Sequence, residues 1–224
     1  MNSYRWFAIS FSGLGSDLCN LISKIDHDSE QWAICSQVNS GILSGSYFKK
    51  LTLSLGRADS SGVMSDLAVE TTVSLEFTIR AQEGAFLLRV SDNKRLAGSF
   101  ISWLSRRAGF GFSSHPVTLV NLVGWELERF SSVDICKMTA LKVSGVTVAP
   151  NIVGRMEFVS KYGMKIDEIR GLPRDGFTVS VVRYELAKSN VTGVLAVHST
   201  GRVSVSGALA PWIVGYVEKK LLAR

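Results

Sequence analysis

The chain has 224 residues, of which 46% are hydrophobic and 20% charged, so it can bury a core and does not have the composition of a disordered segment. Its net charge of +6 at pH 7 favours an anionic partner such as nucleic acid. Three cysteines without a Cys-x-x-Cys spacing exclude a disulfide scaffold and a zinc ribbon, and no apolar run approaches the roughly 20 residues that span a bilayer. We expect an intracellular, soluble protein with no metal, no cofactor and no membrane partner.

The first half of the chain combines period-two apolar patterns, which are typical of strands, with two helical patterns. Ser16 or Asp17 is expected to cap a short helix that runs through Ile25. A second helix is predicted from about Ser99 to Arg107, after a short strand that follows the Asp92-Asn93 turn. Other strands are predicted over residues 6–11, 32–38, 47–55, 69–81 and 86–90.

The second half is predicted to begin after residues 108–115, a stretch rich in Gly and Ser. A strand over 116–125 and a short helical segment over 131–136 open this half. Further strands are predicted over residues 143–148, 154–159, 178–185 and 194–197. The last helix is predicted over Ala210–Leu222, with Pro211 in its first turn, where the missing N–H is harmless.

One stretch of the second half has a weaker copy in the first. Ser199–Ala208 predicts a strand, a tight turn and a second strand that leads into the last helix. Val90–Ser99 runs into the earlier helix in the same way, so that Gly98 takes the place of Gly207. The pattern therefore predicts an internal duplication.

The order of strand, short helix, antiparallel strands and longer helix, taken twice, resembles the saddle fold of the TATA-box-binding protein family. Ser199–Ala208 is similar to a hairpin of that family, and Pro116–Val123, which contains Asn121, resembles its first strand, where an Asn faces DNA. The resemblance implies an α+β fold of two pseudo-repeated halves, residues 1–112 and 113–224, that form a curved antiparallel sheet with helices packed on one face.

Two departures from the family affect its mechanism. Where the family wedges Phe side chains between base steps, this chain has His198 in the second half and Leu88 or Arg89 in the first. The family's Glu-Pro-Glu-like turn is replaced by residues 170–176, Arg-Gly-Leu-Pro-Arg-Asp-Gly. Without aromatic wedges, we do not expect this chain to kink a duplex as the family does.

Basic side chains near the predicted turns are candidates for phosphate contacts. The nucleic-acid-binding candidates are Arg89, Lys94, Arg95, Asn121 and Arg202. Asn121 can be a residue that contacts a base edge or a polar residue on the solvent face of a strand, and both interpretations stay open. The helix pairs Arg106-Arg107 and Lys219-Lys220 are interpreted as solvated charges.

Other residues that could stack on bases or take part in catalysis are interpreted as structural. Phe77, Phe86 and Phe177 could stack on bases, but their apolar neighbours at period two favour the core. His198 has no partner at catalytic spacing and is interpreted as a structural histidine. Asp134 and Cys136, like the earlier Asp17 and Cys19, are interpreted as a helix cap and a buried thiol.

Three classes of function follow from these patterns. The leading hypothesis is a non-catalytic nucleic-acid-binding protein, for DNA or RNA, that uses a basic, open sheet surface. The competing hypothesis is an assembly subunit that binds another protein, or itself as a homo-oligomer, through a sheet face or edge. An enzyme is the least supported class, because no nucleophile turn or metal-binding spacing occurs in the sequence.

Overall fold

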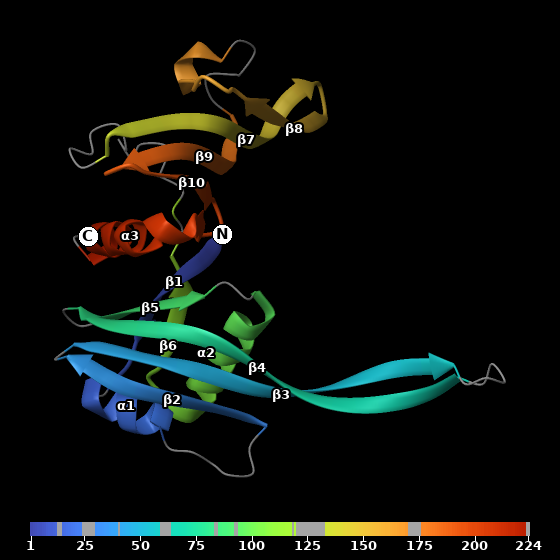
Figure 1. The fold of residues 1–224 in the computed structure, drawn as a ribbon, viewed down its shortest axis with the longest axis vertical. Coiled ribbons are helices and arrows are strands. Elements are labelled where there is room, and N and C mark those ends of the chain that lie inside the picture. The colour runs from blue at the N-terminus through green and yellow to red at the C-terminus, as the bar shows by residue number, and fades with distance from the viewer. Residues whose placement is uncertain are drawn as a thin grey trace. The chain divides into compact units, whose positions relative to one another are not determined.

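The computed structural model describes residues 1–12, 15–23, 30–39, 41–58, 64–82, 85–91, 94–117, 119, 133–169 and 176–222. These residues form mostly antiparallel strands together with helices, so the predicted α+β class is confirmed (Figure 1). The chain divides into an N-terminal unit, Phe7–His115, and a C-terminal unit, Met1–Trp6 with Pro116–Arg224. Strand β1 (Asn2–Ser10) begins in the C-terminal unit and ends in the N-terminal unit. That the two units are related halves stays a prediction.

The N-terminal unit is a sheet with two helices on one face (Figure 1). After β1, its elements are α1 (Gly15–Ser23), β2 (Gln31–Asn39), β3 (Ile42–Ala58), β4 (Met64–Gln82), β5 (Ala85–Ser91), α2 (Lys94–Ala108) and β6 (Ser113–Pro116). The strands lie in the order β2-β3-β4-β5-β1, and β6 also pairs with β1. Strand, short helix, strands and longer helix therefore follow one another in the order that the sequence predicts.

The core of the N-terminal unit lies between the sheet and its helices. Leu18 and Ile22 of α1 and Phe100 and Leu104 of α2 are fully buried against inward-facing strand residues. The ring of Phe100 lies 4.7 Å from that of Phe77 and 5.1 Å from that of Tyr47. This aromatic packing fixes which sheet face the helices cover, and leaves the alternate side chains of each strand on the other face.

A glycine makes room for this packing. A Cβ on Gly45 of β3 would lie 2.7 Å from Cζ of Phe77 and 2.9 Å from Cα of Cys35 on β2. Any side chain at Gly45 would therefore push the Phe77 ring or the neighbouring strand out of place.

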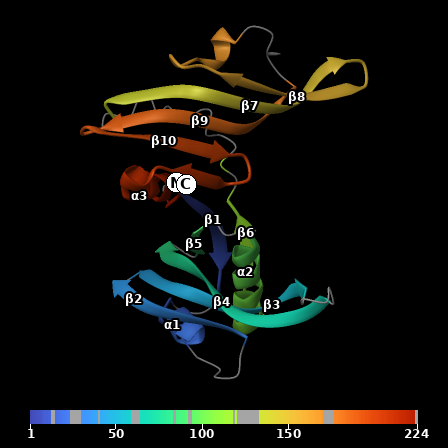
Figure 2. The same cartoon turned by 45° about the vertical axis from the view of Figure 1, so that its right-hand side comes forward.

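Strands β3 and β4 are longer than their neighbours. From Leu51–Ala58 and Met64–Thr71 they continue as a two-stranded ribbon, since β2 pairs with β3 only as far as Lys49 and β5 with β4 only from Phe77 on. We call these two segments the arm, which extends away from its own sheet in both views (Figure 1, Figure 2). Leu53 and Leu55 on the arm are about half exposed, at 46% and 52%.

The short strand predicted after Asp92-Asn93 is wrong. Helix α2 begins at Lys94, so Gly98 lies inside a helix and not before one. Lys, Arg, Leu and Ala are all good helix formers, and Leu96, Ala97 and Phe100 lie at helical spacing on the buried side. Val90–Ser99 therefore does not repeat the hairpin at Ser199–Ala208, although the residue types are similar.

The C-terminal unit is a second antiparallel arrangement. Its elements, besides the start of β1, are β7 (Ile135–Ala149), β8 (Ile152–Val159), the 3₁₀ turn η3 (Ile166–Glu168), β9 (Thr178–Lys188), β10 (Val191–His198), β11 (Arg202–Val205), the 3₁₀ turn η4 (Gly207–Leu209) and α3 (Ala210–Leu222). The strands lie in the order β1-β11-β10-β9-β7-β8. The strands predicted over 143–148, 154–159, 178–185 and 194–197 and the bounds of α3 are confirmed. Of the predicted strand–turn–strand at Ser199–Ala208, the turn and the second strand, β11, are present, but the first strand, β10, ends before it at His198. Most of the strand predicted over 116–125 lies outside the described residues.

Helix α3 and turn η4 lie over one face of this sheet. Ile213 and Val217 of α3 are buried together with Leu195, Val203 and Val205 of the strands. The approach is close at Gly193 of β10, where a Cβ would lie 2.7 Å from Cβ of Ser206 and 2.8 Å from Cδ1 of Leu209. Glycine at this position lets η4 rest directly on β10.

The helical segment predicted over 131–136 is wrong where it can be compared. Residues 131 and 132 lie outside the described residues, but Ile135 and Cys136 begin strand β7. Asp134 does not cap a helix, because its Oδ2 accepts a hydrogen bond from the backbone N of Ser189 at 2.7 Å. The edge of β9 thus orders this segment as a strand, and β-branched Ile and Val fit it.

None of the helices in the described part of the chain is both long enough and apolar enough to cross a membrane.

Candidate nucleic-acid interface

The C-terminal unit presents arginines on the sheet face opposite α3. Leu195 and Val203 point to the α3 side, so Ala196, Ser204 and Arg202 lie on the other face by strand alternation. Ser3 of β1 is directly opposite Ser204. We call this surface, with Ser3, Arg5, Arg183, Arg202 and Ser204, the Arg202 face.

Arg202 is held in place by hydroxyl groups on this face. Its Nη2 donates to Oγ of Ser3 at 3.2 Å, and the Ser3 and Ser204 hydroxyls share a hydrogen bond at 2.7 Å. Ser204 is buried, whereas Arg202 and Ser3 are half-buried. A guanidinium is planar and has five N–H donors, so the bond to Ser3 orients the Arg202 side chain on this face.

Further cations lie around Arg202. Arg5 is directly opposite Arg202 on β1, and Arg183 on β9 is opposite Ala196, which is itself opposite Ser204. From strand dimensions, the Cα atoms of Arg183 and Arg202 are roughly 12 Å apart. Like charges in directly opposite positions of a sheet repel each other, so Arg5 and Arg202 make this part of the face strongly basic.

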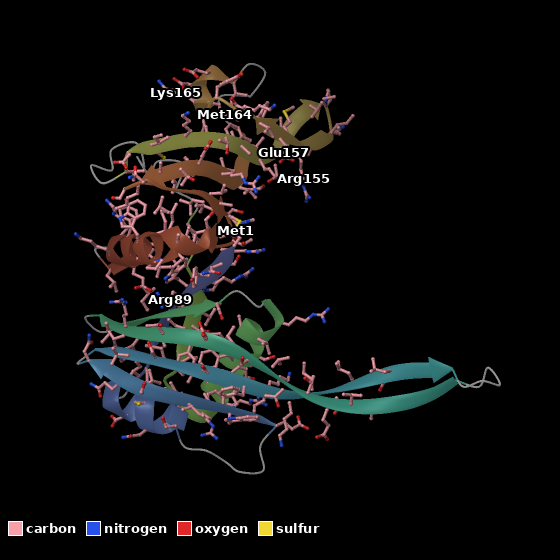
Figure 3. All side chains as sticks on the ribbon, viewed as in Figure 1. Met1, Arg89, Arg155, Glu157, Met164 and Lys165 are labelled. Carbon is pink, nitrogen blue, oxygen red and sulfur yellow. The ribbon has the colours of Figure 1, made fainter. Side chains whose placement is uncertain are left out.

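Acidic residues also occur on this face. Lys142 of β7 forms an ion pair with Glu157 of β8, with Nζ and Oε2 2.9 Å apart, and both side chains are about half exposed. Arg155 and Glu157 are labelled on β8 in Figure 3. Glu185 lies two residues along β9 from Arg183 and is exposed. Besides Arg5, Arg202 and Arg183, the face therefore carries Lys142 and two acidic side chains, Glu157 and Glu185.

The N-terminal unit has a similar arrangement on the sheet face opposite its helices. Nη2 of Arg89 donates to Oγ1 of Thr78 at 2.9 Å, and the Thr78 and Ser44 hydroxyls lie 3.4 Å apart. Arg89, Thr78 and Ser44 are in register on β5, β4 and β3. Figure 3 labels Arg89 on β5. We call the surface with Trp32, Ser44, Phe48, Thr78 and Arg89 the Arg89 face.

The predicted site residues are divided between the two units. Arg89 and Arg202 lie on sheet faces of different units. Arg95 is exposed in the first turn of α2, on the helix that covers the other face of the N-terminal sheet. The side chain of Lys94 and the whole of Asn121 lie outside the described residues, so their predicted roles stay predictions.

Sequence reasoning missed an aromatic pair on the Arg89 face. Trp32 and Phe48 are directly opposite on β2 and β3, with ring centroids 5.3 Å apart and ring planes only 14° apart. Their neighbours Ala33 and Tyr47 are buried against the helices, so both rings lie on the face opposite α1 and α2. The sequence signal that could have predicted this pair is the presence of large side chains at successive positions of β3, Tyr47 and Phe48, which must point to opposite faces of the sheet.

The aromatic residues that the sequence analysis considered as base-stacking candidates do not belong to the Trp32–Phe48 pair. Phe77 belongs to the core, as predicted, and Phe86 packs against it. Phe177 is half-buried and precedes β9, so it does not lie in a strand. Arg107 lies over the ring of Trp103, 4.9 Å from its centroid, and donates to the carbonyl oxygen of Leu21, which gives it a structural role.

The described cysteines are thiols with ordinary structural surroundings. The sulfur atoms of Cys19 and Cys35 lie 3.2 Å apart, between α1 and β2. Burial raises the pKa of the Cys35 thiol from its ordinary 9.0 to about 11, so it is protonated at neutral pH. Within the described residues, His, Cys, Asp and Glu form no group of three or more that could hold a metal ion.

Comparison with known proteins gives no family model that matches the chain and no curated protein with a similar sequence.

Proposed function

We propose that the protein is a non-catalytic nucleic-acid-binding protein that contacts phosphate groups of DNA or RNA through the Arg202 face. The observation that carries this proposal is the position of Arg5 opposite Arg202, with Arg183 nearby on the same sheet face, opposite α3. Arginine binds phosphate oxygens with two parallel N–H bonds, and a fixed guanidinium loses less entropy on binding. The net charge of +6 supports the same class of partner.

The likeness to the TATA-box-binding protein family remains part of this proposal. It is supported by the order of elements in the N-terminal unit and by the β10–β11 hairpin that leads into α3. The absence of a second hairpin at Val90–Ser99 counts against a close repeat. A shared fold would in any case not fix a shared ligand.

Assembly with another protein, or as a homo-oligomer, is the second candidate. It is favoured by exposed apolar residues at the end of the β7–β8 hairpin, where Val148, Ile152 and Val153 are 59%, 57% and 68% exposed. Contiguous apolar surface of this kind often marks a protein contact.

Binding of fluorescent single-stranded DNA, single-stranded RNA and duplex DNA, followed by anisotropy at low salt, tests the proposed function. We expect wild-type protein to bind, and the double variant Arg5→Glu/Arg202→Glu to bind at least about tenfold more weakly, a loss of at least about 1.4 kcal/mol. Lys219→Glu/Lys220→Glu makes the same change in net charge on α3, away from the Arg202 face, and serves as the matched control.

The control variant is expected to retain most of the affinity, because the charges it reverses do not lie at the proposed contact. No detectable binding of any of the three nucleic acids, or equal losses in the two variants, would rule out the Arg202 face as the interface. Light scattering of the wild-type protein at low and high salt checks the assembly alternative.

A further inference from the structure

We propose that the Trp32–Phe48 pair is a stacking platform for an unpaired base, so that the N-terminal unit selects single-stranded over duplex nucleic acid. This inference rests on the proposed function but concerns a different unit and a different type of contact. Stacking on aromatic side chains is available to every base, but only when the base is not already stacked within a duplex.

The two rings are not part of the hydrophobic core. Tyr47 and Ala33, their neighbours in sequence, are at 0% and 1% exposure under the helices, while Trp32 and Phe48 are half-buried on the other face. As a cross-strand aromatic pair, the two rings also stabilise the pairing of β2 with β3. The part of each ring that is not buried is accessible to a ligand on this face.

The orientation of the pair leaves π surface for a ligand. The nearly parallel rings face each other, so the outer face of Phe48 points away from Trp32 and toward β4. There the residue opposite Phe48 is Ser74, which is small and exposed. The outer face of Trp32 points to the sheet edge, because β2 is the last strand in the order. A base can stack on Phe48 above Ser74.

Cations on the same face are placed where the phosphates of a single nucleic-acid strand would lie on either side of the Trp32–Phe48 pair. Lys49 reaches Ser99 on α2 at 3.4 Å, so its neighbour Lys50 lies on the face opposite α1 and α2, two residues from Phe48, and is exposed. Arg89 lies on the other side of Phe48, two strands and four residues away, roughly 16 Å by strand dimensions. Phosphates on either side of a stacked base can therefore meet a cation.

Glu76 and Glu70 also lie on this face by register, and both are exposed. Glu76 is opposite Ser46, between the row of Phe48 and the row of Arg89. Its carboxylate disfavours a phosphate at that point, which confines the expected phosphate contacts to the Lys50 and Arg89 ends. A nucleic acid suits such a face better than an apolar protein surface, since Lys50 and Arg89 flank the rings.

The test compares single-stranded RNA, single-stranded DNA and duplex DNA of equal length with three proteins. Trp32→Leu/Phe48→Leu removes both rings, and Ser74→Leu fills the space beside Phe48 without changing either ring. We expect both variants to lose roughly 5- to 150-fold in affinity for the single strands and to keep wild-type affinity for the duplex. Circular dichroism confirms the fold, and Ser74→Leu keeps the test valid if the double variant does not fold.

Each other outcome overturns the inference. Wild-type affinity of Ser74→Leu for single strands would show that no base enters beside Phe48, while the proposed function would stand if Arg5→Glu/Arg202→Glu still weakened binding. An equal loss for duplex and single strands would show a contact other than base stacking. A wild-type oligomer that dissociates in Trp32→Leu/Phe48→Leu would assign the rings to a protein contact.

Discussion

Arg5 and Arg202 lie directly opposite each other on β1 and β11, in a position where sheets usually avoid like charges. The arrangement predicts that replacing Arg5 by an acidic residue maintains or raises the thermal stability of the protein but lowers its affinity for nucleic acid. Arg5→Glu places a carboxylate opposite Arg202 and keeps the hydrogen bond from Arg202 to Ser3. We expect a midpoint of thermal unfolding at or above that of the wild type, with nucleic-acid affinity clearly reduced.

Thermal unfolding by circular dichroism and anisotropy binding measure the two effects on the same sample. Opposite charges in this position are worth about 0.2–1 kcal/mol relative to a neutral pair. A marked fall in the unfolding midpoint of Arg5→Glu would mean that Arg5 has a structural role that outweighs its repulsion with Arg202.

Gly45 provides a sharp prediction for the core of the N-terminal unit. Gly45→Ala puts a methyl group 2.7 Å from the Phe77 ring and 2.9 Å from the backbone of β2. Because the ring is held by Phe100, we expect destabilisation of about 1–3 kcal/mol, measured by urea unfolding. An unchanged free energy of unfolding would show that the aromatic packing is loose at this point.

Gly98 is the matched control for Gly45, and the opposite sign is expected. It lies in the second turn of α2, is exposed, and a Cβ there meets no atom within 4 Å. Alanine is about 1 kcal/mol more favourable than glycine inside a helix, so Gly98→Ala should stabilise the protein by about that amount. A loss of stability would contradict the helical placement of residues 94–98.

Cys35 predicts a loss of stability in alkali. The raised pKa means that the unfolded chain loses the thiol proton first, near pH 9.0, whereas the folded chain keeps it up to about pH 11. The protonated Cys35 thiol therefore makes its full contribution to the free energy of unfolding below pH 9.0, and this contribution is lost as the pH rises through about 11. Urea unfolding across this window should therefore decline more steeply for the wild type than for Cys35→Ala.

Tyr47 also has a raised pKa, and it is present in both the wild type and Cys35→Ala, so it does not cause a difference between their stabilities in alkali. Burial raises the pKa of Tyr47 from 10.0 to about 12, and the nearby Arg106 lowers it by a smaller amount. Its hydroxyl also donates to Oε1 of Gln31 at 2.8 Å. Since both proteins retain Tyr47, parallel curves for the wild type and Cys35→Ala would refute the assignment to Cys35.

The sequence predicts much of this fold because many segments have one clear periodicity. The pattern of Ala210–Leu222 identifies α3, and the glycine turn at Ser199–Gly201 identifies the β10–β11 hairpin. The same reasoning fails at Lys94–Gly98, where the likeness to another stretch suggested a strand but helix propensity and burial of Leu96 decide the structure. Similar residues in the two places have different tertiary surroundings.

The candidate site was harder to predict than the fold. Arg202 and Arg89 were chosen for their place near turns, but what fixes them is a hydroxyl on the neighbouring strand, Ser3 or Thr78. Ser3 is nearly two hundred residues from Arg202 in the chain, and such a pair depends on strand register. Trp32 and Phe48 were missed for the same reason, since which face they occupy depends on where α1 and α2 pack.

The arm has a consequence for how the N-terminal unit opens. In the described part of β3 and β4, each strand of the arm forms backbone hydrogen bonds only with the other arm strand. The amide groups on the two outer edges of the arm are therefore exposed to solvent. A two-stranded ribbon has little stability of its own. Amide hydrogens of Leu51–Ala58 should therefore exchange with deuterium well before those at Leu43–Tyr47, and the arm should be an early site of cleavage by proteases under native conditions.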